Sequence, residues 1–203
     1  MSCVEILHGS LIKIFIFTEE SHANYIKKAM KEIEAVTCLK FVDRTNEKDY
    51  IHVTGDTTGC SSYIGRIGGA QTVKLAPNSD EKGCFRLFTI AHEFIHALGF
   101  YHMQAASERD QYIRIAWENI QPGKEHNFEL RGADKVSTFS VPYDYGSVMH
   151  YGKSSFSFNG QPTIVPLQDL NALGITMGQR VKISDKDILR INRMYSCTLS
   201  PRK

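Results

Sequence analysis

The stretch that most restricts how this chain can fold is residues 92–102, which read His-Glu-Phe-Ile-His-Ala-Leu-Gly-Phe-Tyr-His. His92 and His96 stand four residues apart, so on a helix they project from the same face, one turn apart. His102 follows after a turn and brings a third imidazole from outside that helix. Zinc accepts nitrogen ligands, and a catalytic zinc site uses three protein ligands and a water. The spacing therefore predicts a zinc site with one side left open.

The residues around the motif predict a helix over about 85–98. Four apolar residues recur at helical spacing and would face a core: Phe88, Ala91, Ile95 and Leu98. Gly99 would end the helix, because a glycine just past the last turn can adopt a left-handed conformation. Glu93 points away from the ligand face and can reach a water without binding the metal. In a segment such as 92–96 alone, the two histidines can also be ordinary surface residues. Gly99 and His102 at this spacing favour a metal site instead.

A second segment, Ser147-Val148-Met149-His150-Tyr151, agrees with the first. Together they resemble the zinc motif and the methionine turn of the astacin family in the metzincin clan, and the resemblance covers nearly the whole chain. It implies a zinc endopeptidase in which Met149 forms an apolar floor beneath the metal. It also implies that Tyr151 is a further zinc ligand at rest and then donates a hydrogen bond to the tetrahedral intermediate. A phenol with an ordinary pKa near 10 suits that role.

Two residues after the motif depart from the family pattern. Met103 stands where the family usually has a glutamate that receives the amino terminus freed from a propeptide, and Ala106 stands where it usually has arginine. Residues 1–5 also do not resemble a family amino terminus. These departures concern activation rather than the zinc ligands. The alternative to an active peptidase is therefore a catalytically impaired, astacin-like binding protein or a zymogen-like form.

The chain has five cysteines, and none shows the close Cys-x-x-Cys spacing of a zinc site. The family pairing would join Cys38 to Cys197 and Cys60 to Cys84, and would leave Cys3 over. Disulfides persist in oxidising compartments, so we expect a secreted, extracellular protein. Buried free thiols are the alternative.

Charge and hydropathy restrict the partners. Lys and Arg number 24 against 22 Asp and Glu, and a formal charge of +2 is too small to argue for nucleic acid or membrane binding. The apolar run at 11–17 is far short of the ~20 residues that span a bilayer, and it predicts a buried strand. It does not resemble a signal peptide, because no basic region precedes it and no small-residue cleavage site follows. We expect a monomer that holds one Zn²⁺ and acts on proteins or peptides.

The patterning predicts an α+β fold. Residues 21–37 read as an amphipathic helix, and a last helix begins at the capping sequence 184–187. Four further short runs read as strands: 39–43, 50–54, 62–65 and 72–76.

We expect one domain over residues 1–203, with two lobes around a cleft. The N-terminal lobe, about 1–99, would hold a mixed sheet and two long helices. The C-terminal lobe, about 100–203, would be irregular and end in one helix. By resemblance, an edge strand at 63–69 or its neighbours would bind an extended substrate through its backbone.

These residues predict peptide-bond hydrolysis. Glu93 would take the proton of the attacking water and pass it to the leaving nitrogen, while zinc and Tyr151 would stabilise the oxyanion. In related sequences the loop equivalent to 177–180 lies near the pocket for the residue after the scissile bond. Arg180 there would favour an acidic side chain through charge-assisted hydrogen bonds. The alternative is that Arg180 is simply solvated.

Overall fold

A computed structural model of the protein describes residues 11–55, 58–132 and 135–198. These form two compact units: one holds the described residues up to Phe100 together with those from Arg180 onward, and the other is Tyr101–Gln179. The chain therefore leaves the first unit after Phe100 and returns to it at Arg180. Cys3 lies outside the described residues.

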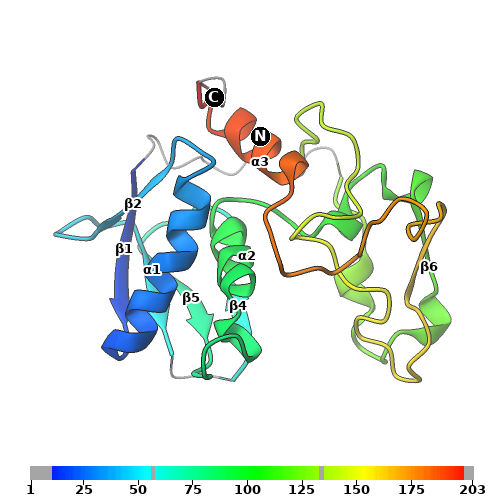
Figure 1. Cartoon of the computed structure of the whole chain (residues 1–203), viewed down its shortest axis with the longest axis horizontal. Coiled ribbons are helices and arrows are strands. Elements are labelled where there is room, and N and C mark those ends of the chain that lie inside the picture. The colour runs from blue at the N-terminus through cyan, green and yellow to red at the C-terminus, as the bar shows by residue number, and fades with distance from the viewer. Residues whose placement is uncertain (1–10, 56–57, 133–134, 199–203) are drawn as a thin grey trace. The chain divides into compact units, whose positions relative to one another are not determined.

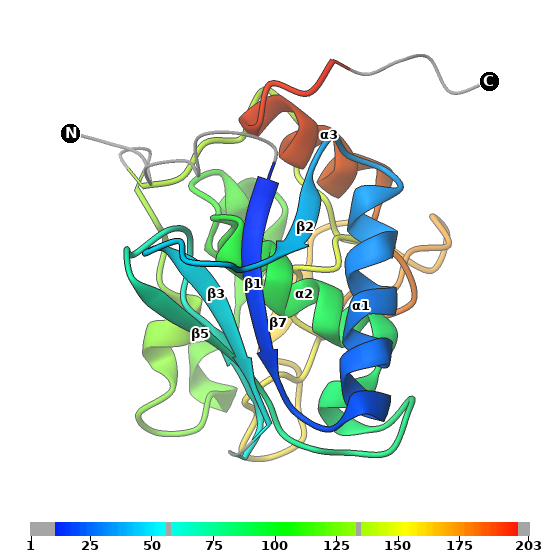
Figure 2. The same cartoon turned by 90° about the vertical axis from the view of Figure 1, so that its left-hand side faces the viewer.

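The first unit is built on a five-stranded sheet with the order β2-β1-β3-β5-β4. The first four strands are parallel, and β4 pairs with β5 in the antiparallel sense at the edge. Figures 1 and 2 show α1 and α2 on the same face of this sheet. The predicted α+β class with a mixed sheet is confirmed. The strands are β1 (Leu11–Phe17), β2 (Lys40–Asp43), β3 (Tyr50–Thr54), β4 (Cys60–Ser62) and β5 (Ala70–Leu75), and the helices are α1 (Glu20–Glu34), η1 (Gly83–Phe85), α2 (Leu87–Ala97) and α3 (Asp185–Met194).

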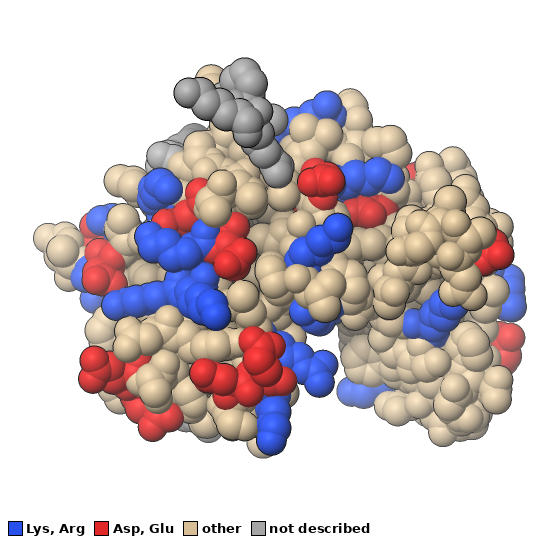
Figure 3. All heavy atoms as spheres, viewed as in Figure 1, with Lys and Arg blue, Asp and Glu red and all other residues tan. Residues whose placement is uncertain are grey.

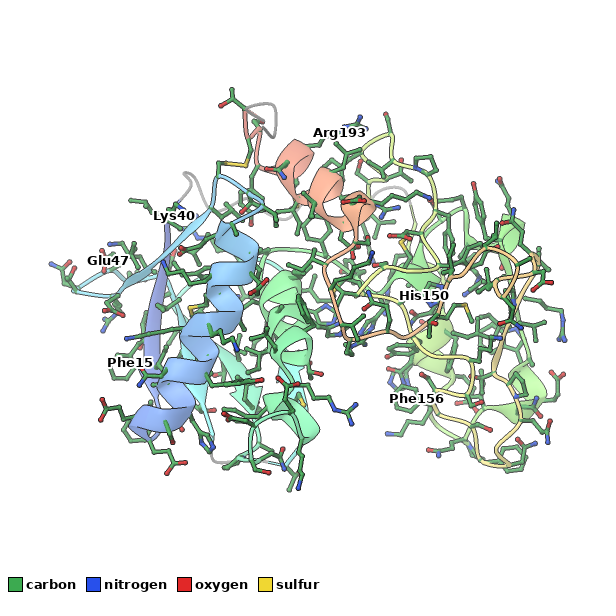
Figure 4. All side chains as sticks on the ribbon, viewed as in Figure 1. Phe15, Lys40, Glu47, His150, Phe156 and Arg193 are labelled. Atoms are coloured by element: carbon green, nitrogen blue, oxygen red, sulfur yellow. A yellow bond between two sulfur atoms is a disulfide. The ribbon has the colours of Figure 1, made fainter. Side chains whose placement is uncertain are left out.

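Strand β1 forms over the predicted run 11–17, but it is buried on one face only. Ile12 and Ile14 face the helices and are buried, whereas Phe15 and Phe17 are 45% and 70% exposed. Both helices cover the same face of the sheet, and Phe15 lies on the side of β1 away from α1 (Figure 4). Side chains alternate along a strand, so every second residue of β1 faces away from the core.

Strand β4 lies earlier in the sequence than predicted, because the backbone leaves the sheet after Ser62. The Gly65 N–H donates to the carbonyl of His96 (2.9 Å) rather than to a neighbouring strand. The Gly69 N–H donates to the Asp49 carboxylate (2.6 Å), which also pairs with Arg66. These contacts shape 63–69 as a fixed loop beside α2.

Helix α3 begins as the sequence predicts. Ser184 caps it by accepting from the Asp187 N–H (2.9 Å), and the Asp187 carboxylate accepts from the Ser184 N–H (3.2 Å). Toward its other end, Asn192 donates to the Val36 carbonyl just after α1, and the Tyr195 hydroxyl donates to the Leu98 carbonyl at the end of α2. Helix α3 thus supplies partners to carbonyls that the ends of α1 and α2 leave unpaired.

A buried carboxylate joins α1 to β2. Glu34 accepts from the Phe41 N–H (2.8 Å) and from the Lys31 ammonium (2.7 Å), and Lys40 lies 3.9 Å away. Burial opposes ionisation of Glu34, but the two hydrogen bonds and the lysine charges outweigh it and hold its pKa below the ordinary value. The ionised form therefore stabilises the fold.

We expect Glu34→Gln to lower the free energy of unfolding by about 1–2 kcal/mol at pH 7, since it removes a charged acceptor from two donors. A depressed folded-state pKa contributes stability above the unfolded pKa, near 4.3, and loses it as the pH falls through the folded value. The difference from wild type should therefore shrink below about pH 4. Urea unfolding at both pH values measures it, with exposed Glu20→Gln as control. An equal difference at both pH values would contradict this account.

The second unit has little regular structure, as predicted for the irregular lobe. Its core is an apolar cluster of buried residues: Ala106, Ile113, Ile115, Ile120, Phe128, Tyr143, Tyr145, Ile164, Leu170 and Met177. Its elements are η2 (Met103–Ala105), η3 (Arg109–Gln111), β6 (Ile113–Ile115), η4 (Trp117–Asn119), η5 (Glu125–Phe128) and β7 (Ile164–Pro166), with β6 and β7 antiparallel.

Surface charge is mixed. Figure 3 shows Lys and Arg interspersed with Asp and Glu over the face that carries α1. No helix among the described residues is both long and apolar enough to cross a membrane.

Candidate metal centre

Helix α2 carries the first two histidines in a buried setting. It packs against α1, β4 and β5, so apolar residues surround most of it. His92, Glu93 and His96 are only 5%, 6% and 5% exposed. These polar residues therefore lie inside the protein, as do Ala91, Ile95 and Leu98 on the predicted apolar face.

Helix α2 ends at Gly99 as predicted. Gly99 has φ +109°, and its N–H donates to the His96 carbonyl (2.8 Å). The next N–H, of Phe100, donates to the Ile95 carbonyl (3.2 Å). This double pairing is a Schellman motif, and it needs a residue that tolerates positive φ. The turn directs the chain toward His102 three residues later.

His92, His96 and His102 can each offer one ligand nitrogen, and these atoms lie within 4.8 Å of one another. The His96 ring is oriented by its Nδ1, which lies 2.7 Å from the Phe100 carbonyl. A carbonyl only accepts, so Nδ1 carries the proton and Nε2 keeps its lone pair for a metal. Burial lowers the pKa of His96 to about 4, so the ring is neutral at physiological pH, as a metal ligand must be. Three imidazoles at this spacing fit zinc.

Glu93 lies on the same helix and is almost fully buried. Burial raises its pKa to about 7, and the charge of Arg180 opposes the shift. A carboxyl whose pKa lies near the working pH is suited to take up and release a proton. Arg180 also acts on His96 through its charge, so its side chain is electrostatically coupled to the same helix.

The edge of the sheet is tied directly to the ligand-bearing helix. The His96 carbonyl accepts from the Gly65 N–H as well as from the Gly99 N–H. Gln71 holds the other side of the loop, because its Nε2 donates to the Gly65 carbonyl (3.0 Å). The loop that follows edge strand β4 is therefore fixed relative to His96.

Within the second unit, Tyr151 lies beside the third histidine. The ring centroids of Tyr151 and His102 are 4.4 Å apart. Met149 is buried, its N–H donates to the Ser147 hydroxyl (2.9 Å), and its carbonyl accepts from the Met103 N–H (3.0 Å). The turn that contains Met149 is thus joined to the residue that follows His102.

Met103 and Ala106, the two departures from the family pattern, both take part in apolar packing. Ala106 is buried within the core cluster of the second unit, and Met103 packs against that cluster. The absence of a charge at these positions is thereby accommodated by hydrophobic contacts.

Two residues of this region were not predicted from the sequence. The Gln104 side chain accepts from the Tyr151 N–H (3.3 Å), and His150 Nδ1 lies 2.8 Å from the Tyr151 carbonyl. Both side chains are fully buried. Their proximity to the zinc motif and the methionine turn was the only signal, and it does not reveal which atoms they contact.

The chain is similar to a known family along almost its whole length. The family model described as Astacin, a peptidase family, matches residues 13–196. Zinc metalloproteinase nas-4 of Caenorhabditis elegans is 42% identical over 174 residues, which cover 85% of this chain and 52% of the relative. Low choriolytic enzyme of Oryzias latipes is 41% identical over 179 residues, which cover 88% of this chain and 62% of the relative.

A solved structure has the same fold. High choriolytic enzyme 1, a hatching-enzyme zinc protease from Oryzias latipes, superposes with a TM-score of 0.86 at 37% identity, covering 98% of this chain and 99% of that one. The chain spans only about half to three fifths of the two curated relatives above.

Proposed function

Because the chain belongs to the astacin family of peptidases, we propose that it is a zinc-dependent endopeptidase acting on protein or peptide substrates. One observation carries the proposal: three histidine ligand atoms lie within 4.8 Å of one another, and buried Glu93 stands next to the first histidine on α2. We propose one Zn²⁺ per chain, held by His92, His96 and His102. A secreted, single-domain monomer with two disulfides is the form we propose for these residues.

The chemistry that follows is hydrolysis of a peptide bond. A zinc ion bound at the three histidines would act as a Lewis acid on the scissile carbonyl and on water. Glu93 takes the proton of the attacking water and transfers it to the leaving nitrogen, and burial has brought its pKa to about 7 for this task. His96 is kept in the ligand tautomer by the Phe100 carbonyl.

Tyr151 has two roles in this proposal. Its phenol oxygen would be a further ligand of a zinc ion held at rest, and its O–H would donate a hydrogen bond to the oxyanion of the tetrahedral intermediate. A donor aimed at developing charge in a site that excludes water contributes a few kcal/mol to catalysis, on the order of 3. Its ring position beside His102 supports the assignment. Met149 is proposed as the apolar floor beneath the metal.

The substrate is proposed to bind as an extended strand along edge strand β4 and the loop after it. Strand β4 is the last strand in the sheet order, so one side of it has no strand partner within the described sheet. Added strands gain backbone hydrogen bonds at such an edge. The hydrogen bond between Gly65 and His96 keeps this segment in fixed register with the metal ligands.

The proposal is tested by measuring zinc content together with casein or gelatin hydrolysis, before and after treatment with a chelator. We expect about one zinc per chain, hydrolysis that stops when the metal is removed, and recovery when zinc is returned. Zinc bound without hydrolysis would contradict the proposed peptidase activity. It would favour the alternative of a non-catalytic binding protein or zymogen-like form, which Met103 suggested because it stands in place of the usual glutamate.

We propose that Arg180 binds an acidic side chain on the substrate residue that follows the scissile bond. We expect Arg180→Ala to reduce the preference for Asp and Glu at that position roughly 10- to 100-fold, the value of a charged hydrogen bond of about 1.5–3 kcal/mol. Profiling a peptide library with wild type, Arg180→Ala and the exposed control Lys27→Ala measures it. A uniform change for all peptides would indicate that Arg180 acts only through the charge of Glu93, and an unchanged acidic preference excludes the pocket role.

A further inference from the structure

The peptide backbone of Tyr151 is held from both sides by buried side chains. Its N–H donates to Gln104 Oε1 (3.3 Å), and its carbonyl lies 2.8 Å from His150 Nδ1. Gln104 and His150 have no measurable exposure to solvent. Figure 4 labels His150 in the interior of the second unit. Both polar groups of the Tyr151 backbone are therefore fixed by side chains of the same unit.

The Gln104 amide can point in only one direction. Its Nε2 donates to the Asn127 carbonyl (3.3 Å), so its oxygen is left to accept from Tyr151. The Gln104 main chain is held as well, because its carbonyl accepts from Nη1 of buried Arg109 (2.9 Å), which also donates to the Phe128 carbonyl (2.7 Å). A buried network in which each group is paired is rigid.

The orientation of the His150 ring is also fixed by hydrogen bonds at both of its nitrogens. The Tyr151 carbonyl only accepts, so His150 Nδ1 must carry the proton, and Nε2 accepts from the Tyr143 hydroxyl 2.7 Å away. The Tyr143 ring is itself stacked on Tyr112, with centroids 4.6 Å apart and planes 7° from parallel. This aromatic stack fixes the hydroxyl that sets the tautomer of His150.

The next peptide is confined by close packing. Gly178 has φ +76°, and a Cβ at this position would lie 2.5 Å from Gly152 Cα and 3.2 Å from the Tyr151 carbonyl carbon. Only glycine leaves room there for the backbone of Tyr151 and Gly152. The Tyr151 side chain, in contrast, is flanked by rings: His102 at 4.4 Å, Phe156 at 5.5 Å and Phe128 at 5.9 Å.

We propose that Gln104 and His150 are positioning residues for Tyr151, which hold its backbone so that its phenol moves only by rotation of its own side chain. The inference rests on the proposed function, in which the phenol donates to the transition state. Because the Tyr151 backbone is fixed, its phenol oxygen returns to the same position on every turnover. A misplacement of about 1 Å in such a group can cost on the order of 100-fold in rate.

The test is a double-mutant cycle in the zinc-loaded enzyme. Gln104→Met keeps the length of the side chain and removes both of its hydrogen bonds. We expect this variant to lower kcat roughly 10-fold or more with KM little changed. A misplaced Tyr151 phenol weakens its hydrogen bond to the oxyanion, and that bond is made only in the transition state. In the Tyr151→Phe background, Gln104→Met should cause no further loss of kcat, since there is no phenol left to position.

The matched control is Thr163→Val. Thr163 is also fully buried in the second unit, and its hydroxyl donates to the Ser155 carbonyl (2.7 Å) and lies 3.2 Å from the Lys153 carbonyl. Like Gln104→Met, the Thr163→Val variant loses buried hydrogen bonding, but to residues other than Tyr151. Its kcat should therefore stay near wild type even though its free energy of unfolding falls. If Thr163→Val lowers kcat as much as Gln104→Met, the effect is general loosening of the unit and the inference is wrong.

Tyr143→Phe provides a second variant if Gln104→Met does not fold. It removes only the donor to His150 Nε2 and should lower kcat less than Gln104→Met, again with no effect in the Tyr151→Phe background. In copper-substituted enzyme, the charge-transfer absorption from the Tyr151 oxygen to copper should weaken or shift in Gln104→Met and in Tyr143→Phe, and vanish in Tyr151→Phe.

The outcomes distinguish the positioning role of Gln104 and His150 from the proposed role of Tyr151 itself. If Tyr151→Phe leaves kcat unchanged, the proposed role of Tyr151 fails, and this inference fails with it. If Tyr151→Phe is impaired but the losses from Gln104→Met and Tyr151→Phe multiply in the double variant, only the positioning role is overturned. A copper spectrum unchanged in the positioning variants would overturn it as well.

Discussion

Glu93→Ala should bind zinc as wild type does and lose peptidase activity about 1,000-fold or more, in the range of a lost general base. The three groups that can hold the metal are histidines, so removing the Glu93 carboxylate leaves all of them in place. It is the carboxylate next to His92 on α2, and burial places its pKa at about 7. The measurements are zinc per chain and kcat/KM on one peptide substrate. Near-wild-type turnover in this variant would refute the mechanism.

Glu93→Gln distinguishes chemistry from folding. Because the folded-state pKa of Glu93 lies above its unfolded value, the carboxyl destabilises the metal-free protein once the pH exceeds the unfolded pKa, near 4.3. The neutral amide removes that cost, so the metal-free variant should unfold at a higher urea concentration than wild type at pH 7. A variant that is more stable and yet inactive cannot owe its inactivity to misfolding.

Removing the disulfide between Cys38 and Cys197 should lower the free energy of unfolding by about 2–5 kcal/mol. The structure joins these residues at a sequence separation of 159, with their Cα atoms 5.4 Å apart. Closing so long a loop restricts the unfolded chain strongly. Urea unfolding of the Cys38→Ala, Cys197→Ala double variant, without reductant, measures the loss.

The second disulfide provides the matched comparison. Cys60 and Cys84 are 24 residues apart in sequence. The loop-closure relation predicts that the Cys60→Ala, Cys84→Ala variant loses about 1.5 kcal/mol less than the first pair. If the shorter loop proves to matter as much, native contacts rather than chain entropy account for the stabilisation.

The features that could be predicted from the sequence are local ones. The ligand helix, its end at Gly99 and the capping box at Ser184 each depend on residues within one or two turns of each other. The pairing of cysteines and the role of Tyr151 came from family resemblance instead. Neither residue spacing nor periodicity alone would have supplied them.

The features that could not be predicted depend on distant contacts. Strand β4 ends at Ser62 because the next residues bond to Asp49 and α2, far away in sequence. The exposure of Phe15 reflects the placement of both helices on one face of the sheet. The contacts of Gln104 arise only once residues 127 and 151 meet it in the folded second unit.

The first unit is discontinuous along the chain, and this has a consequence for biosynthesis. A ribosome delivers the polypeptide in order, so the sheet, α1 and α2 emerge well before α3 and Cys197. Until then the nascent chain lacks the partners of the Val36 and Leu98 carbonyls, and Cys38 lacks Cys197, its disulfide partner. Cys60 and Cys84 can be oxidised early, whereas Cys38 must wait until Cys197 has been synthesised. Enzymes that rearrange disulfides would therefore find their substrate in the window between the two events.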